Sequence, residues 1–167
     1  MKNNRFGQAK VLDTSELDLV IKYLKTRNQK VVAATLRNTG ARVGEVVQLR
    51  WRDIGKDQIL FPASITKRKL KSREVFISDK FHSFLIDWSR YWTIYKGRKP
   101  LPEDFVFYGR KEGTHQTTRS FMDALDKATE RAKIIKFSSH GFRRSALTSA
   151  NEKGISLKTL QAISGHK

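Results

Sequence analysis

The 167-residue sequence contains no cysteine, which excludes disulfide-stabilised folds, thiolate zinc sites and cysteine nucleophiles. It has no apolar run long enough to span a membrane. No apolar segment follows residues 1–5 either, so we expect neither a membrane partner nor a secretory signal. The three prolines and ten glycines are scattered and form no linker. The length suits one domain, and we therefore predict a single cytoplasmic domain over residues 1–167.

Acidic residues are also scarce, because 16 Asp and Glu stand against 34 Lys and Arg and leave a net charge of +18. Residues 1–60, 61–100 and 101–167 each carry an excess of five to seven positive charges, so the charge belongs to the whole domain and not to a tail. A basic folded surface is typical of proteins that bind a polyanion. Nucleic acid is the partner that this charge predicts first, and a surface that is merely basic is the alternative.

Apolar residues make up 38% of the chain and include ten phenylalanines, which is enough for a core. Most of them recur at helical spacing. Asp13 followed by Glu16 predicts a capping box at the first helix, and Gly40 predicts the end of the second. The helices are expected at about residues 17–24, 30–38, 42–49, 81–92, 121–132, 140–152 and 156–163.

Two β-like runs at residues 59–61 and 75–77 interrupt the helical pattern and predict a small antiparallel sheet. Five of the seven positions 67–73 between them are Lys or Arg. The predicted fold class is therefore mainly α (α+β), a helical domain with a small antiparallel sheet that carries a basic hairpin.

The segment from Thr39 to Glu45 predicts a phosphate contact. Gly40 ends one helix and the next begins at once, which places Arg42 beside unpaired backbone N–H groups at a helix start. The guanidinium of Arg42 has a planar fork of donors that fits two phosphate oxygens, and Glu45 is placed to hold that fork. The alternative is a surface Arg42–Glu45 helix pair of little energetic weight.

Two later motifs carry histidines. His140 and Arg143 lie one helical turn apart in a predicted helix, and Arg144 adds a second charge. A histidine beside an arginine suits proton transfer or hydrogen bonding to an oxyanion, although a histidine near a helix start is often only a cap. His166 follows Gly165 just after the last predicted helix. Together these groups are all donors or cations, which predicts a site that stabilises a phosphorane-like transition state.

These motifs, in this order and at these intervals, resemble the catalytic domain of tyrosine recombinases, the phage integrase family. The resemblance covers roughly residues 10–167. It implies cleavage and rejoining of double-stranded DNA through a 3′-phosphotyrosine, without a cofactor or a metal. It also implies a tetramer on DNA for the complete protein, whereas we expect this chain alone to be a monomer.

The resemblance also implies roles for particular residues. Arg42 and Arg143 would bind the scissile phosphate, and His140 and His166 would assist by hydrogen bonding and proton transfer. Lys67 would protonate the departing 5′-oxygen, with Lys69 as the alternative, and Glu45 would support the arginines. The remaining cations expected to contact DNA are Arg68, Lys69, Lys71, Arg73 and Arg144.

The family's nucleophile is a tyrosine shortly after the Gly-His pair, and the sequence stops at Lys167. None of the four tyrosines, Tyr23, Tyr91, Tyr95 and Tyr108, matches that position. We therefore expect a C-terminally incomplete catalytic domain that lacks the family's separate core-binding domain and is itself inactive. A non-catalytic DNA-binding regulator of the same fold is the alternative. A metal-dependent nuclease would need convergent carboxylates, and the acidic residues here fall mostly on helix surfaces.

Overall fold

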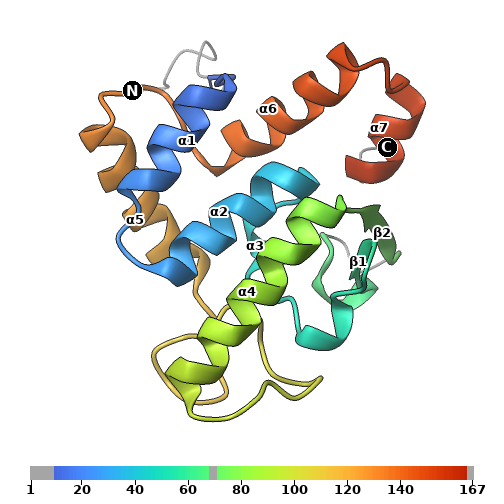
Figure 1. Cartoon of the computed structure of the whole chain (residues 1–167). Coiled ribbons are helices and arrows are strands. Elements are labelled where there is room, and N and C mark those ends of the chain that lie inside the picture. The colour runs from blue at the N-terminus through green and yellow to red at the C-terminus, as the bar shows by residue number, and fades with distance from the viewer. Residues whose placement is uncertain (1–9, 68–70, 165–167) are drawn as a thin grey trace.

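The computed structural model describes residues 10–67 and 71–164 as a bundle of helices with a two-stranded sheet at one side (Figure 1). The α-helices are α1 (Thr14–Tyr23), α2 (Arg27–Thr39), α3 (Val43–Val46), α4 (Asp79–Lys96), α5 (Thr118–Arg131), α6 (Ser139–Glu152) and α7 (Leu157–Ser164). Two 3₁₀ turns, η1 (Trp51–Asp53) and η2 (Ala63–Ile65), flank strand β1 (Gln58–Phe61), and β2 (Arg73–Phe76) completes the sheet. The predicted fold class is confirmed.

The helices begin and end at residues that local chemistry selects. The carboxylate of Asp13 accepts from the backbone N–H of Glu16 at 2.8 Å, and the Glu16 carboxylate accepts from the N–H of Asp13 at 3.1 Å, which is the predicted capping box. A second box between Thr26 and Gln29 starts α2 three residues before the predicted position. Gly40 ends α2 as expected, in the left-handed conformation (φ 62°) that glycine adopts at little cost.

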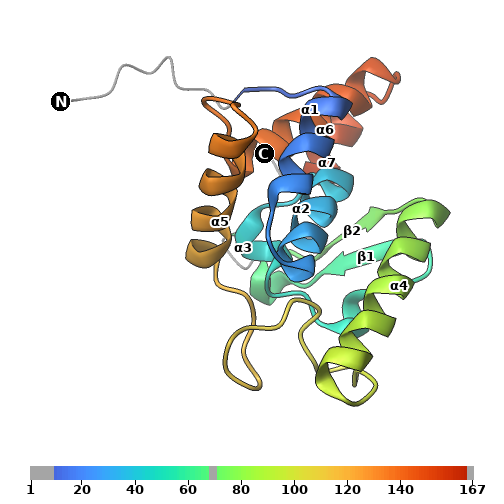
Figure 2. The same ribbon diagram turned by 60° about the vertical axis from the view of Figure 1, so that its left-hand side comes forward.

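The core lies between α2, which runs through the middle of the molecule, and the elements around it (Figure 2). α2 packs against α6, α1 against α5, and α7 against β2. The largest fully buried side chains are Trp92, Phe61, Phe107, Phe121 and Phe142. Among the described residues, no helix combines the length and the apolar character needed to cross a membrane.

The sheet is the predicted antiparallel pair, in a register that sets Phe61 opposite Arg73. The chain between these residues makes the turn η2 and then the basic segment, of which residues 68–70 lie outside the description. The hydroxyl of Thr66 links the two ends of this segment, because it can donate to the carbonyl oxygen of Ala63 at 3.0 Å and to that of Lys71 at 3.2 Å. Below we call residues 67–72 the basic loop.

The third helix is much shorter than predicted. A helix was expected over residues 42–49, but α3 covers only Val43–Val46, and Arg42 takes an extended conformation as its N-cap. The reason is a distant contact. The carbonyl of Leu49 accepts from the N–H of Val106 at 2.9 Å, and Arg50 forms an isolated β-bridge with Phe105. The chain must leave the helix after Val47 to make this pairing.

Candidate active site

Arg42 is held at the turn between α2 and α3. The left-handed Gly40 redirects the chain, and the Glu45 carboxylate then accepts from the backbone N–H of Arg42 at 3.1 Å and from its Nη1 at 3.3 Å. The side chain of Arg42 remains 25% exposed and that of Glu45 only 3%. The predicted Arg42–Glu45 pair therefore exists, and its acidic partner is buried.

Glu45 also binds a second arginine. Arg73, on β2, donates from Nη1 to Oε1 at 3.2 Å and from Nη2 to Oε2 at 2.5 Å, in a two-pronged contact. Burial alone would raise the pKa of Glu45, but the hydrogen bonds and charge of Arg73, together with Arg42, hold that pKa below its usual value. Glu45 is thus a buried carboxylate that two guanidinium groups keep ionised.

Arg73 joins three elements. Its Nε donates to the carbonyl of Ile163 in α7 at 3.0 Å, and its guanidinium lies 4.7 Å from the ring centre of Phe61 on β1. Its side chain is 12% exposed. From the sequence we expect Arg73 to contact DNA, and in the structure its N–H groups donate to Glu45 and to the carbonyl of Ile163. The signal for this was available, because strand alternation places Arg73 on the same face as the buried Val75.

Arg143 comes from α6 and reaches the same turn. It is 5% exposed, and it donates from Nη1 to the carbonyl of Gly40 at 3.1 Å and from Nη2 to the carbonyl of Ser164. Burial, and then the like charge of Arg42, lower the pKa of Arg143 to about 10, while Glu45 opposes that shift. Arg143 therefore stays cationic at neutral pH although it is buried.

We call Arg42, Glu45, Arg73 and Arg143 the arginine cluster. Arg42 and Arg73 bind the Glu45 carboxylate, and Arg143 is held at the same turn by backbone carbonyls, so the cluster sums to three cations and one anion. Such a set of fixed donors suits an anion with several oxygens, such as a phosphodiester. Within residues 10–67 and 71–164, no three His, Cys, Asp or Glu side chains gather in a group that could hold a metal ion.

Of the other predicted site residues, some are described and some fall outside the description. His140 is exposed one turn before Arg143 on α6, and Arg144 is half-buried beside it. Lys67 and Lys71 are exposed at the two ends of the basic loop. His166, Arg68 and Lys69 fall outside the described residues. The roles expected for all of these residues stay predictions.

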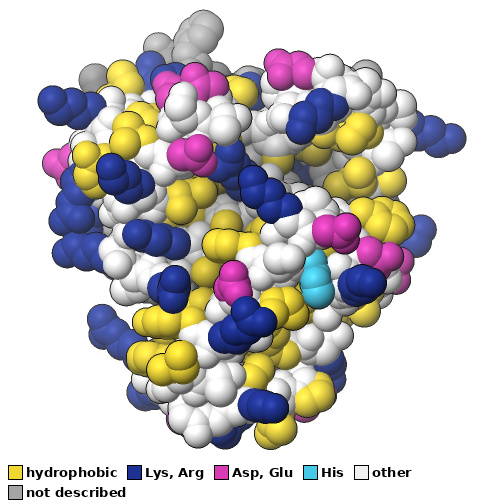
Figure 3. Space-filling model, viewed as in Figure 1, with side chains coloured by type: hydrophobic (Ala, Val, Ile, Leu, Met, Phe, Trp, Pro, Cys, Tyr) yellow, Lys and Arg dark blue, Asp and Glu magenta, His cyan; other side chains and the backbone are white. Residues whose placement is uncertain are grey.

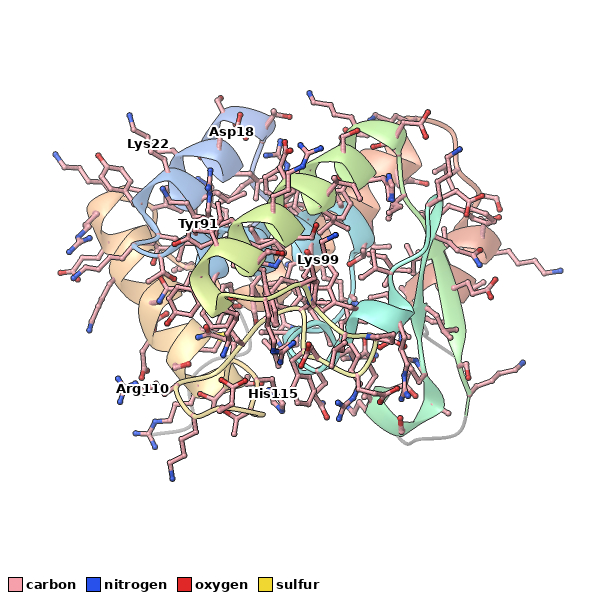
Figure 4. All side chains as sticks on the ribbon, turned by 60° about the horizontal axis from the view of Figure 1, so that its bottom comes forward. Asp18, Lys22, Tyr91, Lys99, Arg110 and His115 are labelled. Carbon is pink, nitrogen blue, oxygen red and sulfur yellow. The ribbon has the colours of Figure 1, made fainter. Side chains whose placement is uncertain are left out.

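Three of the four tyrosines belong to an aromatic stack on α4 and the following loop, where Tyr91 is seen in Figure 4. Trp88 stacks on Tyr91 at 5.5 Å and on Tyr108 at 5.9 Å, and Tyr95 stacks on Tyr108 at 4.5 Å between ring centres. Burial, with the neighbouring tyrosines, raises the pKa of Tyr108 to about 12. Tyr23 is the last residue of α1.

Comparison with known proteins bears on this arrangement. The model of the phage integrase family matches residues 10–167. Transposase A of transposon Tn554 from Staphylococcus aureus is 27% identical over 169 residues, which cover 95% of this chain and 46% of the transposase. The chain thus spans about half the length of the curated relatives it matches.

The fold is similar to that of two solved recombinases. A crystal structure of XerA recombinase matches with a TM-score of 0.76 at 20% identity, over 94% of this chain and 56% of the XerA chain. A XerH site-specific recombinase bound to its difH substrate, in a pre-cleavage complex, matches with a TM-score of 0.73 at 21% identity. That match covers 93% of this chain and 47% of the XerH chain.

Proposed function

We propose that this chain, which belongs to the phage integrase family, forms the phosphate-activating part of a site-specific recombinase that cleaves and rejoins double-stranded DNA. In the reaction, a tyrosine hydroxyl of the complete protein attacks a backbone phosphorus. A 3′-phosphotyrosine bond forms, and the bond to the 5′-oxygen of the next nucleotide breaks. Rejoining is the reverse, with the 5′-hydroxyl as nucleophile. The energy of the broken bond is kept in the covalent intermediate.

The observation that carries this proposal is the convergence of Arg42 and Arg143. They lie 101 positions apart in the sequence, yet both are anchored at the α2–α3 turn, Arg42 as the N-cap of α3 and Arg143 through the Gly40 carbonyl. Their fixed forks would bind the non-bridging oxygens of the phosphate and stabilise the extra negative charge of the phosphorane-like transition state. Because Glu45 and Arg73 already hold the cluster, little reorganisation is needed when that charge develops.

The remaining roles belong to groups around the cluster. Lys67 stands at the start of the basic loop, where an ammonium group would donate a proton to the departing 5′-oxygen. His140 and His166 would donate hydrogen bonds to the same phosphate. Lys71 and Arg144 would contact neighbouring phosphates, as would Arg68 and Lys69. The complete protein is inferred to act as a tetramer on DNA, and this chain alone to be a monomer.

The test uses the full-length product of the gene that encodes this chain. It is incubated with labelled, nicked duplex DNA in the presence of EDTA, and covalent adducts are resolved on a denaturing gel. We expect an adduct whose formation slows at least ~10²-fold in Arg42→Lys and in Arg143→Lys, since each change loses the fork but keeps the charge. Arg90→Lys, on the exposed face of α4, is the matched control and should react at the wild-type rate.

Binding is measured on the same proteins, so that loss of reaction is separated from loss of the complex. Affinity for DNA should change little in either cluster variant. If the wild-type protein binds DNA but forms no adduct on any nicked substrate, it is a DNA-binding regulator and not a recombinase. If the adduct forms only without EDTA, a metal-dependent reaction replaces the proposed one.

A further inference from the structure

A second cationic region lies away from the arginine cluster. It is an open hollow of about 270 Å³, lined by the connection between α1 and α2, by the loop before α5 and by α5 itself. Its cationic lining residues are Lys25, Arg110, Lys127 and Arg131, and Asp123 is its one acidic residue. Figure 3 shows Lys and Arg side chains gathered on the side of the molecule where α1 and α5 lie, and Figure 4 shows Arg110 extending outward beside α5. We call this feature the α1–α5 hollow.

The charge in the α1–α5 hollow is not balanced within the protein. None of its four cations forms an ion pair with any described residue. Lys127 and Arg131 are also four residues apart on α5, where like charges repel. All four side chains are exposed to solvent, so their charges are available to an anion from outside the protein.

A second hollow of the same protein provides the contrast. Its lining includes Arg50 and Lys96, together with the acidic residues Glu103, Asp104 and Glu112. There Lys96 pairs with Glu112 at 2.8 Å, and the guanidinium of Arg50 donates to the carbonyl of Glu103 and lies over Phe105. The cations of that hollow are satisfied internally. The overall charge of the chain therefore does not by itself produce unpaired cations in every hollow.

The α1–α5 hollow is connected to the arginine cluster through α5. Thr118, the first residue of α5, has its hydroxyl 3.9 Å from the place that a Cβ on Gly44 of α3 would occupy. From Thr118 to Arg131 the helix axis rises about 20 Å at 1.5 Å per residue. α5 thus starts beside α3 and lines the hollow from Ser120 to Arg131, so the far end of the hollow lies, along α5, about half the ~34 Å repeat of a DNA helix from α3.

We propose that the α1–α5 hollow binds phosphates of the DNA backbone about half a helical turn away from the phosphate that the arginine cluster holds. Four cations spread along α5 and two connections suit a row of phosphates better than one small anion, for which donors converge on a point. Lys and Arg contacts of this type fix the position of the duplex and carry no base information. The proposal rests on DNA being the substrate, as in the proposed function.

The test compares two double variants of this chain that lose the same charge. Lys127→Gln with Arg131→Gln empties the hollow of half its cations, and Lys56→Gln with Lys153→Gln removes two exposed cations over other elements. Affinity for a duplex longer than two helical turns is measured from low to moderate salt. Each lost phosphate contact should make the slope of log K against log salt less steep by about 0.9. We expect a change of about 1–2 for the hollow variant and none for the control.

Thermal melting and circular dichroism confirm that each variant is folded. If the double change on α5 unfolds the chain, Arg110→Gln in the adjoining loop is measured instead, with an expected slope change of about 1. Equal slopes and affinities for hollow and control variants would overturn the proposal. So would an unchanged DNA slope combined with loss of stabilisation by inorganic phosphate, because the hollow would then bind a small anion. The covalent-adduct assay reports on the proposed function separately, since it does not involve these residues.

Discussion

The arginine cluster and the basic loop hold their cations in opposite ways. In the cluster, Arg73 and Arg143 are almost fully buried, and some of their N–H donors are bound to Glu45 and to backbone carbonyls, which fixes the orientation of each guanidinium group. In the basic loop, Lys67 and Lys71 are exposed. Both regions are cationic and both belong to the same proposed site, yet among the described residues only the guanidinium groups of the cluster, and not the Lys67 and Lys71 side chains, are held by hydrogen bonds within the protein.

This difference suits the two regions to different functions: stabilising the transition state at the phosphate, and attracting the DNA and delivering a proton. A donor that is already desolvated and oriented stabilises a developing charge without reorganising, which is why fixed arginines suit the transition state. An exposed lysine keeps its hydration and its rotamers until a substrate arrives, which suits attraction of the duplex and delivery of a proton to a leaving group. The comparison therefore predicts that changes in the cluster affect stability and rate together, whereas changes in the loop affect rate or binding alone.

Removal of the buried carboxylate should have the largest effect on stability. Glu45→Gln removes the carboxylate that pairs with the largely buried Arg73, and we expect a loss of about 3 kcal/mol in the free energy of unfolding. Urea denaturation at neutral pH measures it. Glu152→Gln, exposed at the end of α6, is the control and should stay within about 0.5 kcal/mol of wild type. Equal stability of the two variants would mean that the cluster does not depend on Glu45.

The contribution of Glu45 to stability should also depend on pH, and the direction of that dependence can be predicted. The pKa of Glu45 in the folded protein lies below its ordinary value of 4.5, so the unfolded chain takes up the proton first as the pH falls. The contribution of Glu45 is then complete above about pH 4.5 and is lost as the pH drops through the folded-state pKa. The stability gap between wild type and Glu45→Gln should narrow in acid. A gap that widens there would contradict the assignment.

A change in the basic loop should slow the reaction without destabilising the fold. Lys67→Ala in the full-length protein should reduce the cleavage rate by about 10²-fold, the lower range for general acid catalysis, and leave urea stability unchanged. A substrate with sulfur in place of the 5′-bridging oxygen should restore most of the rate, because a thiolate leaves without a proton. If that substrate rescues Lys69→Ala and not Lys67→Ala, the proton donor is Lys69 and the comparison between the regions still holds.

The parts of this molecule that sequence predicts well are those decided by neighbours along the chain. The Asp13–Glu16 box and the left-handed Gly40 depend on residues within one turn, so their helix boundaries could be anticipated. The early end of α3 could not be anticipated, because it depends on the pairing of residues 49 and 50 with Val106 and Phe105, which are distant in the sequence.

The same distinction applies to the candidate site. Arg42 and Arg143 each sit in a recognisable local motif, but the pairing of Glu45 with Arg73 joins residues 28 positions apart, and only the strand alternation hinted at it. Packing also explains why position 141 is a glycine, which the sequence motif alone does not show. A Cβ at Gly141 would lie 2.2 Å from the ring of Phe137, so this position between His140 and Phe142 has no room for a side chain.

The smallest predicted effect concerns Lys71, at the far end of the basic loop. Its side chain is exposed, and its backbone carbonyl accepts from the Thr66 hydroxyl. That hydrogen bond does not involve the ammonium group, so it should persist when the charge is removed. Lys71→Gln should make the salt slope of DNA binding less steep by about 0.9, equivalent to one phosphate contact, and Lys71→Arg should retain the wild-type slope. The free energy of unfolding should be unchanged in both variants, because the exposed Lys71 side chain makes no contact that stabilises the described part of the fold. If Lys71→Gln instead destabilises the protein as Glu45→Gln does, the loop is held by its charges just as the cluster is, and the two regions are not different in kind.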